Sequence, residues 1–277
     1  MTGLRGIAVT AAQVVLTALV GLMAIRMAGA PSSAMAIQAG AWGLGLALAV
    51  GLAIRPRRPG PRATLAIIAL LFAGLLATLG GPEIEGARRW ISVGPITLHP
   101  ASILVPLALW AHAGRPSSWN VAGLLGAAAL LAAAQPDAAA SLALLVGLLA
   151  ILPTRRITAT EIVPVLCAVA GAVWSWTRPD DLPAVAYVET VVASAGPAAG
   201  GAALLLMLAI PAPFVLMARR AAERAPFMAM AGLWGGFVIA NLVGNYPAPV
   251  LGYGASAVVG WMISLGLAVG LGRKARA

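Results

Sequence analysis

Long apolar runs and short polar connections alternate along the whole chain. The runs are apolar on every side, whereas a strand of a membrane barrel alternates apolar and polar positions. A helix satisfies its own backbone hydrogen bonds in lipid, and roughly 20 apolar residues are enough to cross a bilayer. The runs cover residues 6–27, 35–54, 63–80, 98–114, 121–134, 138–152, 162–176, 185–217, 226–243 and 253–271. The pattern predicts an all-α, polytopic membrane protein with about ten transmembrane helices.

Composition agrees with a membrane protein and excludes a soluble globular one. The chain has 277 residues, of which 61% are hydrophobic and 9% are charged, and its mean hydropathy is +0.96. A soluble core of this size cannot bury so much apolar surface, so lipid must be the solvent. Because the runs leave no room for a soluble domain, we expect a single transmembrane domain over residues 1–277.

Basic residues are distributed unevenly between the two sets of connections. Most of them fall in alternate connections, at Arg5, Arg55, Arg57, Arg58, Arg62, Arg115, Arg155, Arg156, Arg219, Arg220, Arg224, Arg273, Lys274 and Arg276. The other connections hold four arginines and most of the acids, at Arg26, Arg88, Arg89, Arg178, Glu83, Glu85, Asp137, Asp180 and Asp181. Cytoplasmic connections are enriched in Lys and Arg, so both termini are predicted to be cytoplasmic. This topology explains the formal charge of +10 without a nucleic-acid partner.

Two features of the runs bear on how the helices are arranged. The basic start and the small residues near residues 34–36 imitate a cleaved signal peptide, but the length of the first run favours a retained helix. Pro211 and Pro213 interrupt the eighth run and predict a broken helix. Broken backbone at membrane depth borders a cavity or packs within protein, so a central cleft is one interpretation.

The sequence offers little for metal or cofactor chemistry. Cys167 is the single cysteine and lies in an apolar run, so neither a disulfide framework nor a thiolate metal site can form within the chain. We find no nucleotide-binding loop, no cluster of metal ligands and no Ser-His-Asp pattern. We therefore expect no cofactor and no metal.

The segment at residues 86–94 is the first candidate for function. It reads Gly-Ala-Arg-Arg-Trp-Ile-Ser-Val-Gly and places Arg88, Arg89 and Trp90 on the outer side, against the charge rule. A guanidinium group matches phosphate oxygens bidentately, so this segment suits a phosphate or pyrophosphate headgroup. The structural alternative is that the arginines pair with Glu83 and Glu85.

Two other segments carry polar residues among apolar ones. Gln135 and Asp137 lie in a short connection between the fifth and sixth runs, where an ionisable residue is a functional candidate and a helix cap is the alternative. Tyr253 and Ser256 open the tenth run after a segment rich in Pro and Gly, where a structural turn and a ligand contact are both consistent with the pattern.

In this order, the segments resemble those of the SEDS family, which includes the RodA and FtsW proteins of bacterial cell-wall synthesis. Members have ten spans with both termini inside, a Gly-Ala-Arg-Arg-Trp type segment after the third span, a Gln-Pro-Asp between the fifth and sixth, and a Pro-Phe-x-Ser-Tyr-Gly-Gly-Ser before the tenth. Residues 86–91 and Gly94 match most specifically, and residues 135–137 match by position. The resemblance covers most of the chain and implies a multi-pass protein of the bacterial inner membrane.

What the resemblance implies is a peptidoglycan glycosyltransferase that polymerises lipid II beside a class B penicillin-binding transpeptidase. Arg88 and Arg89 would then face the pyrophosphate, and Asp137 would line the central cavity with Gln135. The family's general base is an Asp in a long outer loop before the eighth span, within reach of the sugar hydroxyl.

The sequence departs from the family in that outer loop. Only a remnant of the loop is present, and its two possible registers place the catalytic Asp at Val185 or Val188, neither of which is a carboxylate. Glu189 and Asp181 are the nearby residues that could replace it. After His99 and Pro100, Ala101, Ser102 and Val105 also stand where the family has Ser, Glu and Lys.

Three hypotheses follow for the function. In the first hypothesis, the chain is a non-catalytic SEDS relative that binds lipid II or a cell-wall partner and acts in cell division or cell shape. It is, alternatively, an active lipid II polymerase. A third hypothesis is a flippase for a lipid-linked precursor, or an unrelated transporter.

Overall fold

The computed structural model describes residues 3–55, 58–94, 96–178, 182–219, 221 and 223–274. The helices are α1 (Gly3–Met27), α2 (Ser32–Ile54), α3 (Pro61–Thr78), α4 (Pro100–Ala113), α5 (Trp119–Ala134), α6 (Ala138–Ile151), α7 (Ala159–Trp176), α8 (Val191–Ser194), α9 (Pro197–Leu208), α10 (Ala212–Ala218), α11 (Ala225–Val243) and α12 (Ala255–Lys274). A 3-10 helix, η1 (Leu152–Thr154), extends α6, and the strands β1 (Ile91–Val93) and β2 (Ile96–Leu98) form an antiparallel hairpin.

The helices correspond to the predicted membrane runs. Among the described residues, seven segments are long and apolar enough to cross a membrane, at Ala8–Met27, Ser32–Ile54, Pro61–Thr78, Ala159–Trp176, Pro197–Ala218, Ala225–Val243 and Ala255–Gly272. Three shorter apolar helices, at Pro100–Ala113, Trp119–Ala134 and Ala138–Thr154, account for the other runs. The all-helical, multi-pass fold is confirmed, while passage of the three shorter helices through a bilayer stays a prediction.

Two elements differ from the expected pattern. The hairpin of β1 and β2 was not expected from runs that are apolar throughout. The eighth run was also predicted to begin too early, because residues 182–190 form a loop and the span begins at Pro197. Gly196 adopts a φ of 81°, which favours glycine, and the Pro197 that follows occupies a first-turn position of a helix. The break predicted at Pro211 and Pro213 is confirmed, since α9 ends at Leu208 and α10 begins at Ala212.

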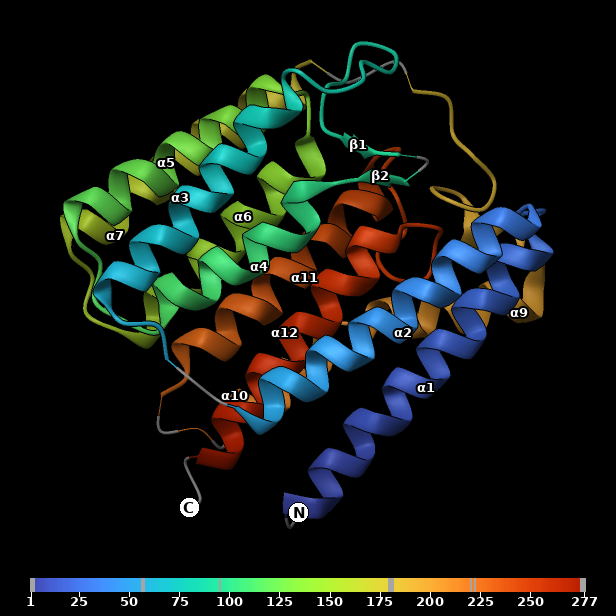
Figure 1. The fold of residues 1–277 in the computed structure, drawn as a ribbon, viewed down its shortest axis with the longest axis horizontal. Helices are drawn as coiled ribbons and strands as arrows, with labels where there is room; N and C mark the ends of the chain where they lie inside the picture. Colours follow the sequence, from blue (N-terminus) through green and yellow to red (C-terminus); the bar gives the residue numbers. More distant parts are fainter. Residues whose placement is uncertain are drawn as a thin grey trace.

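The helices form a bundle with α11 and α12 in its interior (Figure 1). The buried share of the span is 67% in α11 and 72% in α12, against 22% in α1. In the interior, α12 packs against α2 and α4, while α11 packs against α6. The more exposed helix α1 carries Val15, Leu16 and Leu19 on its surface, as expected of a helix that faces lipid.

Small residues allow α6 and α11 to approach closely. A Cβ atom added at Gly236 would lie 2.5 Å from the Cα of Ala143, and one added at Gly232 would lie 2.5 Å from the carbonyl oxygen of Val146. In a membrane, close backbone contact of this kind supplies van der Waals packing between helices.

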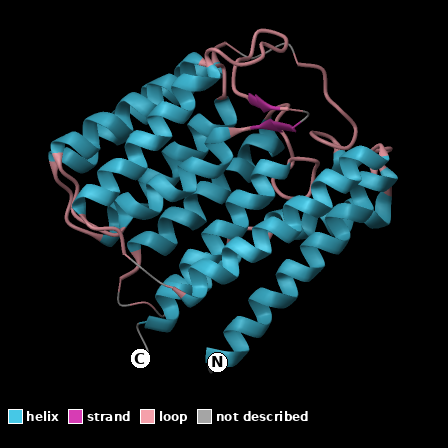
Figure 2. Ribbon diagram, in the orientation of Figure 1, coloured by secondary structure: helices cyan, strands magenta, loops and turns pink. Residues whose placement is uncertain are grey.

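The motif-bearing connections gather at one end of the bundle. Figures 1 and 2 show that α1 begins and α12 ends at one end, which we call the terminal end. The β1–β2 hairpin marks the opposite end, which we call the hairpin end. The hairpin end also carries the connection of α5 to α6, the loop after α7 and the segment before α12. The cytoplasmic location of the terminal end stays a prediction.

Candidate functional site

A buried carboxylate, that of Asp137, lies at the centre of a polar cluster at the hairpin end. Asp137 is 1% exposed, and its Oδ2 lies 2.8 Å from Nε2 of His99. The other ring nitrogen of His99, Nδ1, lies 2.7 Å from Oγ of Ser102. Ser256 joins the cluster because its Oγ accepts the backbone N–H of His99 at 3.0 Å. We call Arg89, His99, Ser102, Asp137 and Ser256 the Asp137 cluster.

Helix starts position three members of this cluster. Asp137 caps the N-terminus of α6, where its Oδ1 accepts the backbone N–H of Ala140 at 3.0 Å. His99 immediately precedes α4, whose first residue is Pro100. Ser256 lies in the first turn of α12. Since α4, α6 and α12 all begin at the hairpin end, side chains far apart in the sequence meet there.

Arg89 supplies the positive charge of the cluster. Its side chain donates from Nη1 to the carbonyl oxygen of Pro136 at 3.3 Å, and the residue is 6% exposed. The guanidinium carbon lies 4.7 Å from the centre of the Trp90 ring and 5.9 Å from that of Tyr246, within the range of cation–π attraction. Arg89 is therefore held against the turn that carries Asp137.

The surroundings of Asp137 keep its carboxyl group ionised. Burial raises the pKa of Asp137, but the charge and hydrogen bond of His99, the charge of Arg89 and the N–H of Ala140 together outweigh it. The pKa therefore lies below the ordinary value for an aspartate. A stable anion in this place fixes the orientation of His99.

The neighbouring Arg88 does not belong to the cluster. Its guanidinium pairs with Glu83, with 2.5 Å between Nη2 and Oε2, and its side chain is 51% exposed. The pairing with glutamate that the sequence left open thus holds for Arg88. The structure separates two residues for which we expected a single role.

Gln135 anchors the turn between α5 and α6 to another helix. Its side-chain amide donates to the carbonyl oxygen of Leu75 in α3 at 2.5 Å. Its Oε1 is buried and has no partner among the described residues. Gln135 therefore supports the turn that presents Asp137.

The loop at residues 182–190 lies against the segment before α12. The carbonyl oxygen of Val188 accepts the N–H of Ala248 at 3.0 Å, and that of Tyr187 accepts the N–H of Tyr253 at 2.8 Å. Gln38 of α2 fixes the other side of this segment, because its Oε1 accepts the N–H of Gly254 and its Nε2 donates to the carbonyl oxygen of Gly252, both at 3.1 Å. Tyr253 is thus part of a tethered loop.

Of the two acidic candidates of this loop, Glu189 lies within the described residues. The carboxylate of Glu189 accepts the backbone N–H of Val185 at 2.9 Å, which closes a turn within the loop. Asn241 donates to the carbonyl oxygens of both Glu189 and Tyr246, so the backbone of Glu189 lies close to that of Tyr246, whose ring contacts Arg89. Asp181 lies outside the described residues.

The chain of hydrogen bonds from Asp137 through His99 to Ser102 has the residue types of a hydrolytic triad. Ser102 is 7% exposed, and its backbone packs directly against Gly260 of α12, where a Cβ atom would collide with it. This packing between α4 and α12, together with the hydrogen bond to His99, gives Ser102 a structural role. The cluster is better suited to hold Arg89 and His99 at the hairpin end, where they can bind an anion.

His99 is the residue of this site whose role the sequence did not indicate. It appeared there only as part of a motif, although an isolated histidine before a helix is a possible partner for an isolated aspartate. Among the described residues, no group of three or more His, Cys, Asp or Glu side chains could hold a metal ion.

Comparison with known proteins identifies the fold. No family model and no curated protein sequence matches the chain. Solved structures do match: the rod shape determining protein RodA of Thermus thermophilus has 22% sequence identity and a TM-score of 0.64, and the match covers 95% of each chain. An aspartate-to-alanine mutant of that RodA gives the same values. A chain from a structure on the coordination of polymerization and crosslinking by a peptidoglycan synthase complex has 22% identity and a TM-score of 0.61, with 95% of this chain and 97% of that chain covered.

These similarities extend over nearly the whole length of the chain and of its neighbours, so they describe the complete arrangement of helices rather than a shared fragment. The chain has the fold of RodA, which is the SEDS-like fold that its three motifs predicted.

Proposed function

We propose that this chain is a SEDS-type membrane protein of bacterial peptidoglycan synthesis that binds the pyrophosphate of lipid II at its hairpin end without polymerising it. The observation that carries the proposal is the Asp137 cluster, in which a nearly buried arginine is held at the outer end of a RodA-like fold. The proposed site consists of residues that contact the precursor and residues that position them, and its members are Arg88, Arg89, Trp90, Gln135, Asp137, Tyr253 and Ser256.

Arg89 is the main anion-binding residue in this proposal. Its guanidinium has a planar fork that matches phosphate oxygens, and its position is fixed by Pro136 and the Trp90 ring. Arg88 is a secondary contact, because an exposed ion pair such as that with Glu83 is worth about 1 kcal/mol or less and a pyrophosphate can displace it. Asp137, Gln135 and Ser256 act by positioning Arg89, His99 and the turn between them.

The absence of polymerase activity follows from the outer loop. Val185 and Val188 cannot accept a proton, and the Glu189 carboxylate is engaged with the backbone of its own loop. Glu189 is the one carboxylate among residues 182–190 of the loop, and Asp181 lies outside the described residues. Loss of a general base costs about 10²-fold or more in rate. We propose that the chain instead acts beside a partner of the cell-wall machinery, such as a class B penicillin-binding transpeptidase. A neighbour in fold belongs to a peptidoglycan synthase complex, which supports this kind of partner.

Lipid II binding by the purified full chain tests the binding proposal. Arg89→Gln should weaken binding about tenfold, because one charged contact to phosphate is worth roughly 1.5 kcal/mol or more. Arg88→Gln is the matched control at the next position and should weaken it by less than about threefold. Equal losses in the two variants, or no binding by the wild type, would contradict the role of Arg89.

A polymerisation assay tests the missing activity. The chain alone should form no glycan strands from lipid II. Polymer made by the chain alone would favour the second candidate, an active polymerase with Glu189 as the base. The nearness of Glu189 to Tyr246, through Asn241, is the observation in its favour. In that case Glu189→Gln should abolish the activity while leaving lipid II binding intact.

A further inference from the structure

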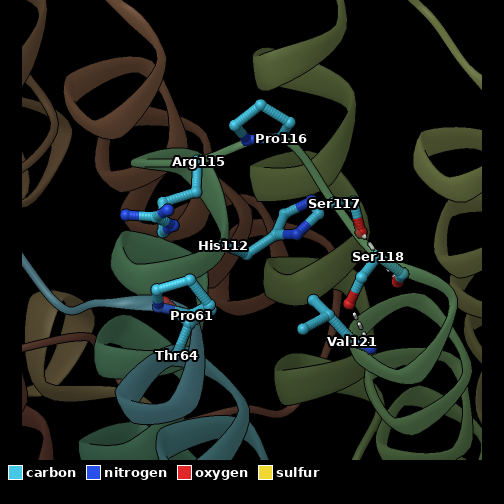
Figure 3. Close-up of a pocket in the computed structure, with 8 residues that line it drawn as sticks. All are labelled: Pro61, Thr64, His112, Arg115, Pro116, Ser117, Ser118 and Val121. Carbon is cyan, nitrogen blue, oxygen red and sulfur yellow. Dashed lines mark hydrogen bonds between the residues drawn. The ribbon is translucent and has the colours of Figure 1, made fainter.

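A cavity of about 220 Å³ lies at the terminal end, opposite the Asp137 cluster along α4 and α5. It is formed where α4 ends and where α3 and α5 begin, and Pro61, Thr64, His112, Arg115, Ser118 and Val121 are among its lining residues (Figure 3). In Figure 3, Arg115 and Pro61 lie on one side of the His112 ring, and Ser118 and Val121 lie on the other.

One edge of the His112 ring belongs to a buried ion cluster. Its Nε2 lies 3.2 Å from Oε2 of Glu161, and Nη2 of Arg155 lies 3.1 Å from the same oxygen. Arg155 also donates from Nη1 to the carbonyl oxygens of His112 at 3.3 Å and Arg115 at 2.7 Å, at the C-terminal end of α4. These contacts give Glu161, Arg155 and Nε2 of His112 a structural role.

The other edge of the His112 ring, at Nδ1, is not part of this ion cluster. Nδ1 of His112 and Oγ1 of Thr64 are buried and have no hydrogen-bond partner among the described residues. Both residues line the cavity, and they are only 2% and 4% exposed. Buried polar atoms without partners are costly and uncommon. Two of them in one cavity indicate a polar occupant.

The charge around the cavity favours an anion. Arg115 lines it, and the N-terminal ends of α3 and α5 adjoin it, each with backbone N–H groups and the positive end of a helix dipole. The nearby Glu161 carboxylate is already shared by Arg155 and His112. Since an ionised carboxylate only accepts, Nε2 of the His112 ring carries the proton that faces Glu161, which leaves Nδ1 as an acceptor for a hydroxyl group of the occupant, such as a protonated phosphate oxygen or a headgroup hydroxyl.

We propose that this cavity binds a phosphate-type oxyanion, with Nδ1 of His112 and Oγ1 of Thr64 as hydrogen-bond partners and Arg115 as counter-charge. The source is either free phosphate or the headgroup of an anionic phospholipid. Trp119 begins α5 directly after Ser118 and is 63% exposed, as expected of a tryptophan at the level of lipid headgroups. A headgroup phosphate therefore lies at the right depth to enter.

Binding of two probes to the purified full chain tests the site. Inorganic phosphate is titrated in detergent against sodium chloride of equal ionic strength, with the thermal unfolding midpoint as the readout. In parallel, the protein is extracted from vesicles of phosphatidylglycerol or of phosphatidylcholine, and retained lipid is measured by native mass spectrometry. The wild type should respond to phosphate but not to chloride, or should retain phosphatidylglycerol in preference to phosphatidylcholine.

The variants separate the cavity from general surface charge. Thr64→Val removes the hydroxyl at nearly constant volume, and His112→Gln keeps a donor toward Glu161 but removes Nδ1. Arg115→Gln removes the charge, and each of the three should weaken binding about tenfold. Arg156→Gln is the control, because Arg156 is exposed at the same end and does not line the cavity. If His112→Gln does not fold, the binding measured for Thr64→Val and Arg115→Gln still tests the proposal.

The outcomes are distinct. Retained phosphatidylglycerol that phosphate displaces supports the site with a headgroup as its source, and phosphate binding without lipid retention supports it with a soluble source. Binding of neither probe by the wild type, or unchanged binding by Thr64→Val and Arg115→Gln, overturns the proposal.

Discussion

At the scale of single residues, Arg88 and Arg89 show how two neighbours in the sequence come to have different surroundings. They lie between Ala87 and β1, where burial alternates along the chain: Ala87 and Arg89 are buried and Arg88 is exposed. Arg88 therefore faces Glu83, while Arg89 faces the turn that carries Asp137. Any ligand that enters at the hairpin end meets an exposed charge at Arg88 and a nearly buried one at Arg89.

Asp137→Ala should destabilise the protein by about 3 kcal/mol or more, because it removes the cap of α6 and leaves His99 and Arg89 around a missing charge. Asp137→Asn keeps the shape and the contact to Ala140, so its cost should be smaller. Thermal unfolding in detergent measures both. A larger loss for Asn than for Ala would contradict this account.

The same carboxylate carries a pH signature. Because the pKa of Asp137 is lowered in the fold, its stabilising effect is present at neutral pH and is lost as the pH falls below about 4. The difference in unfolding midpoint between the wild type and Asp137→Asn should therefore shrink in acid. A difference that is constant from neutral to acidic pH would mean that charge is not what Asp137 contributes.

Sequence reasoning found the residues of this site more easily than their partners. Arg89 and Asp137 are conspicuous because charged residues are costly among apolar runs. That His99 lies against Asp137, 38 positions away, depends on α4 and α6 beginning side by side. Glu161 and His112 were missed at the other end, because each lies within an apolar helix and neither position indicates that the two meet.

At the scale of elements, the contact between α6 and α11 depends directly on glycine. Gly232 and Gly236 are one turn apart on α11, and both lie against the backbone of α6. The apolar pattern predicted the two helices but could not predict this contact, because glycines are frequent throughout the chain and several helical ones, such as Gly40, Gly43 and Gly201, would have no atom near an added Cβ. Which glycines lie at a close contact depends on where the two helices cross.

Gly236→Ala should cost about 1–3 kcal/mol, because the added methyl group would lie 2.5 Å from the Cα of Ala143 and the helices must move apart. Gly235→Ala is the control on the next position, where the nearest atom is a side-chain carbon of Pro211 at 3.9 Å. It should leave stability unchanged or slightly raised. The thermal unfolding midpoints of the two variants, measured under the same conditions, test this prediction. Equal midpoints would show that the close contact is not required.

At the scale of the whole molecule, the arginines and the motifs separate to opposite ends of the bundle. The connections rich in arginine lie at the terminal end, and the three motifs lie at the hairpin end. This much followed from the alternation of runs. The tether of the loop at residues 182–190 did not, because its backbone hydrogen bonds to Ala248 and Tyr253 join segments distant in sequence. The hairpin and the late start of the eighth span were also missed, although both are local features: β1 and β2 are adjacent in sequence, and the span begins at Gly196 and Pro197.

Cysteine labelling tests the orientation. In a Cys167→Ala background, Ser92→Cys in β1 should react with a membrane-impermeant maleimide added to intact spheroplasts, since the hairpin end is predicted to face outward. Thr158→Cys, which is also exposed but lies before α7 at the terminal end, should react only after the membrane is permeabilised. The reverse pattern would invert the proposed topology.

The tether made by Gln38 has a consequence for how the protein is made. Its two hydrogen-bond partners, Gly252 and Gly254, are synthesised more than 200 residues after it. Chains are made from the N-terminus, so α2 enters the bilayer with a buried amide that stays without these partners until the last loop arrives. The hairpin end of the bundle is therefore completed only at the end of translation, and a nascent chain that stops before residue 252 leaves the amide of Gln38 without either of these partners.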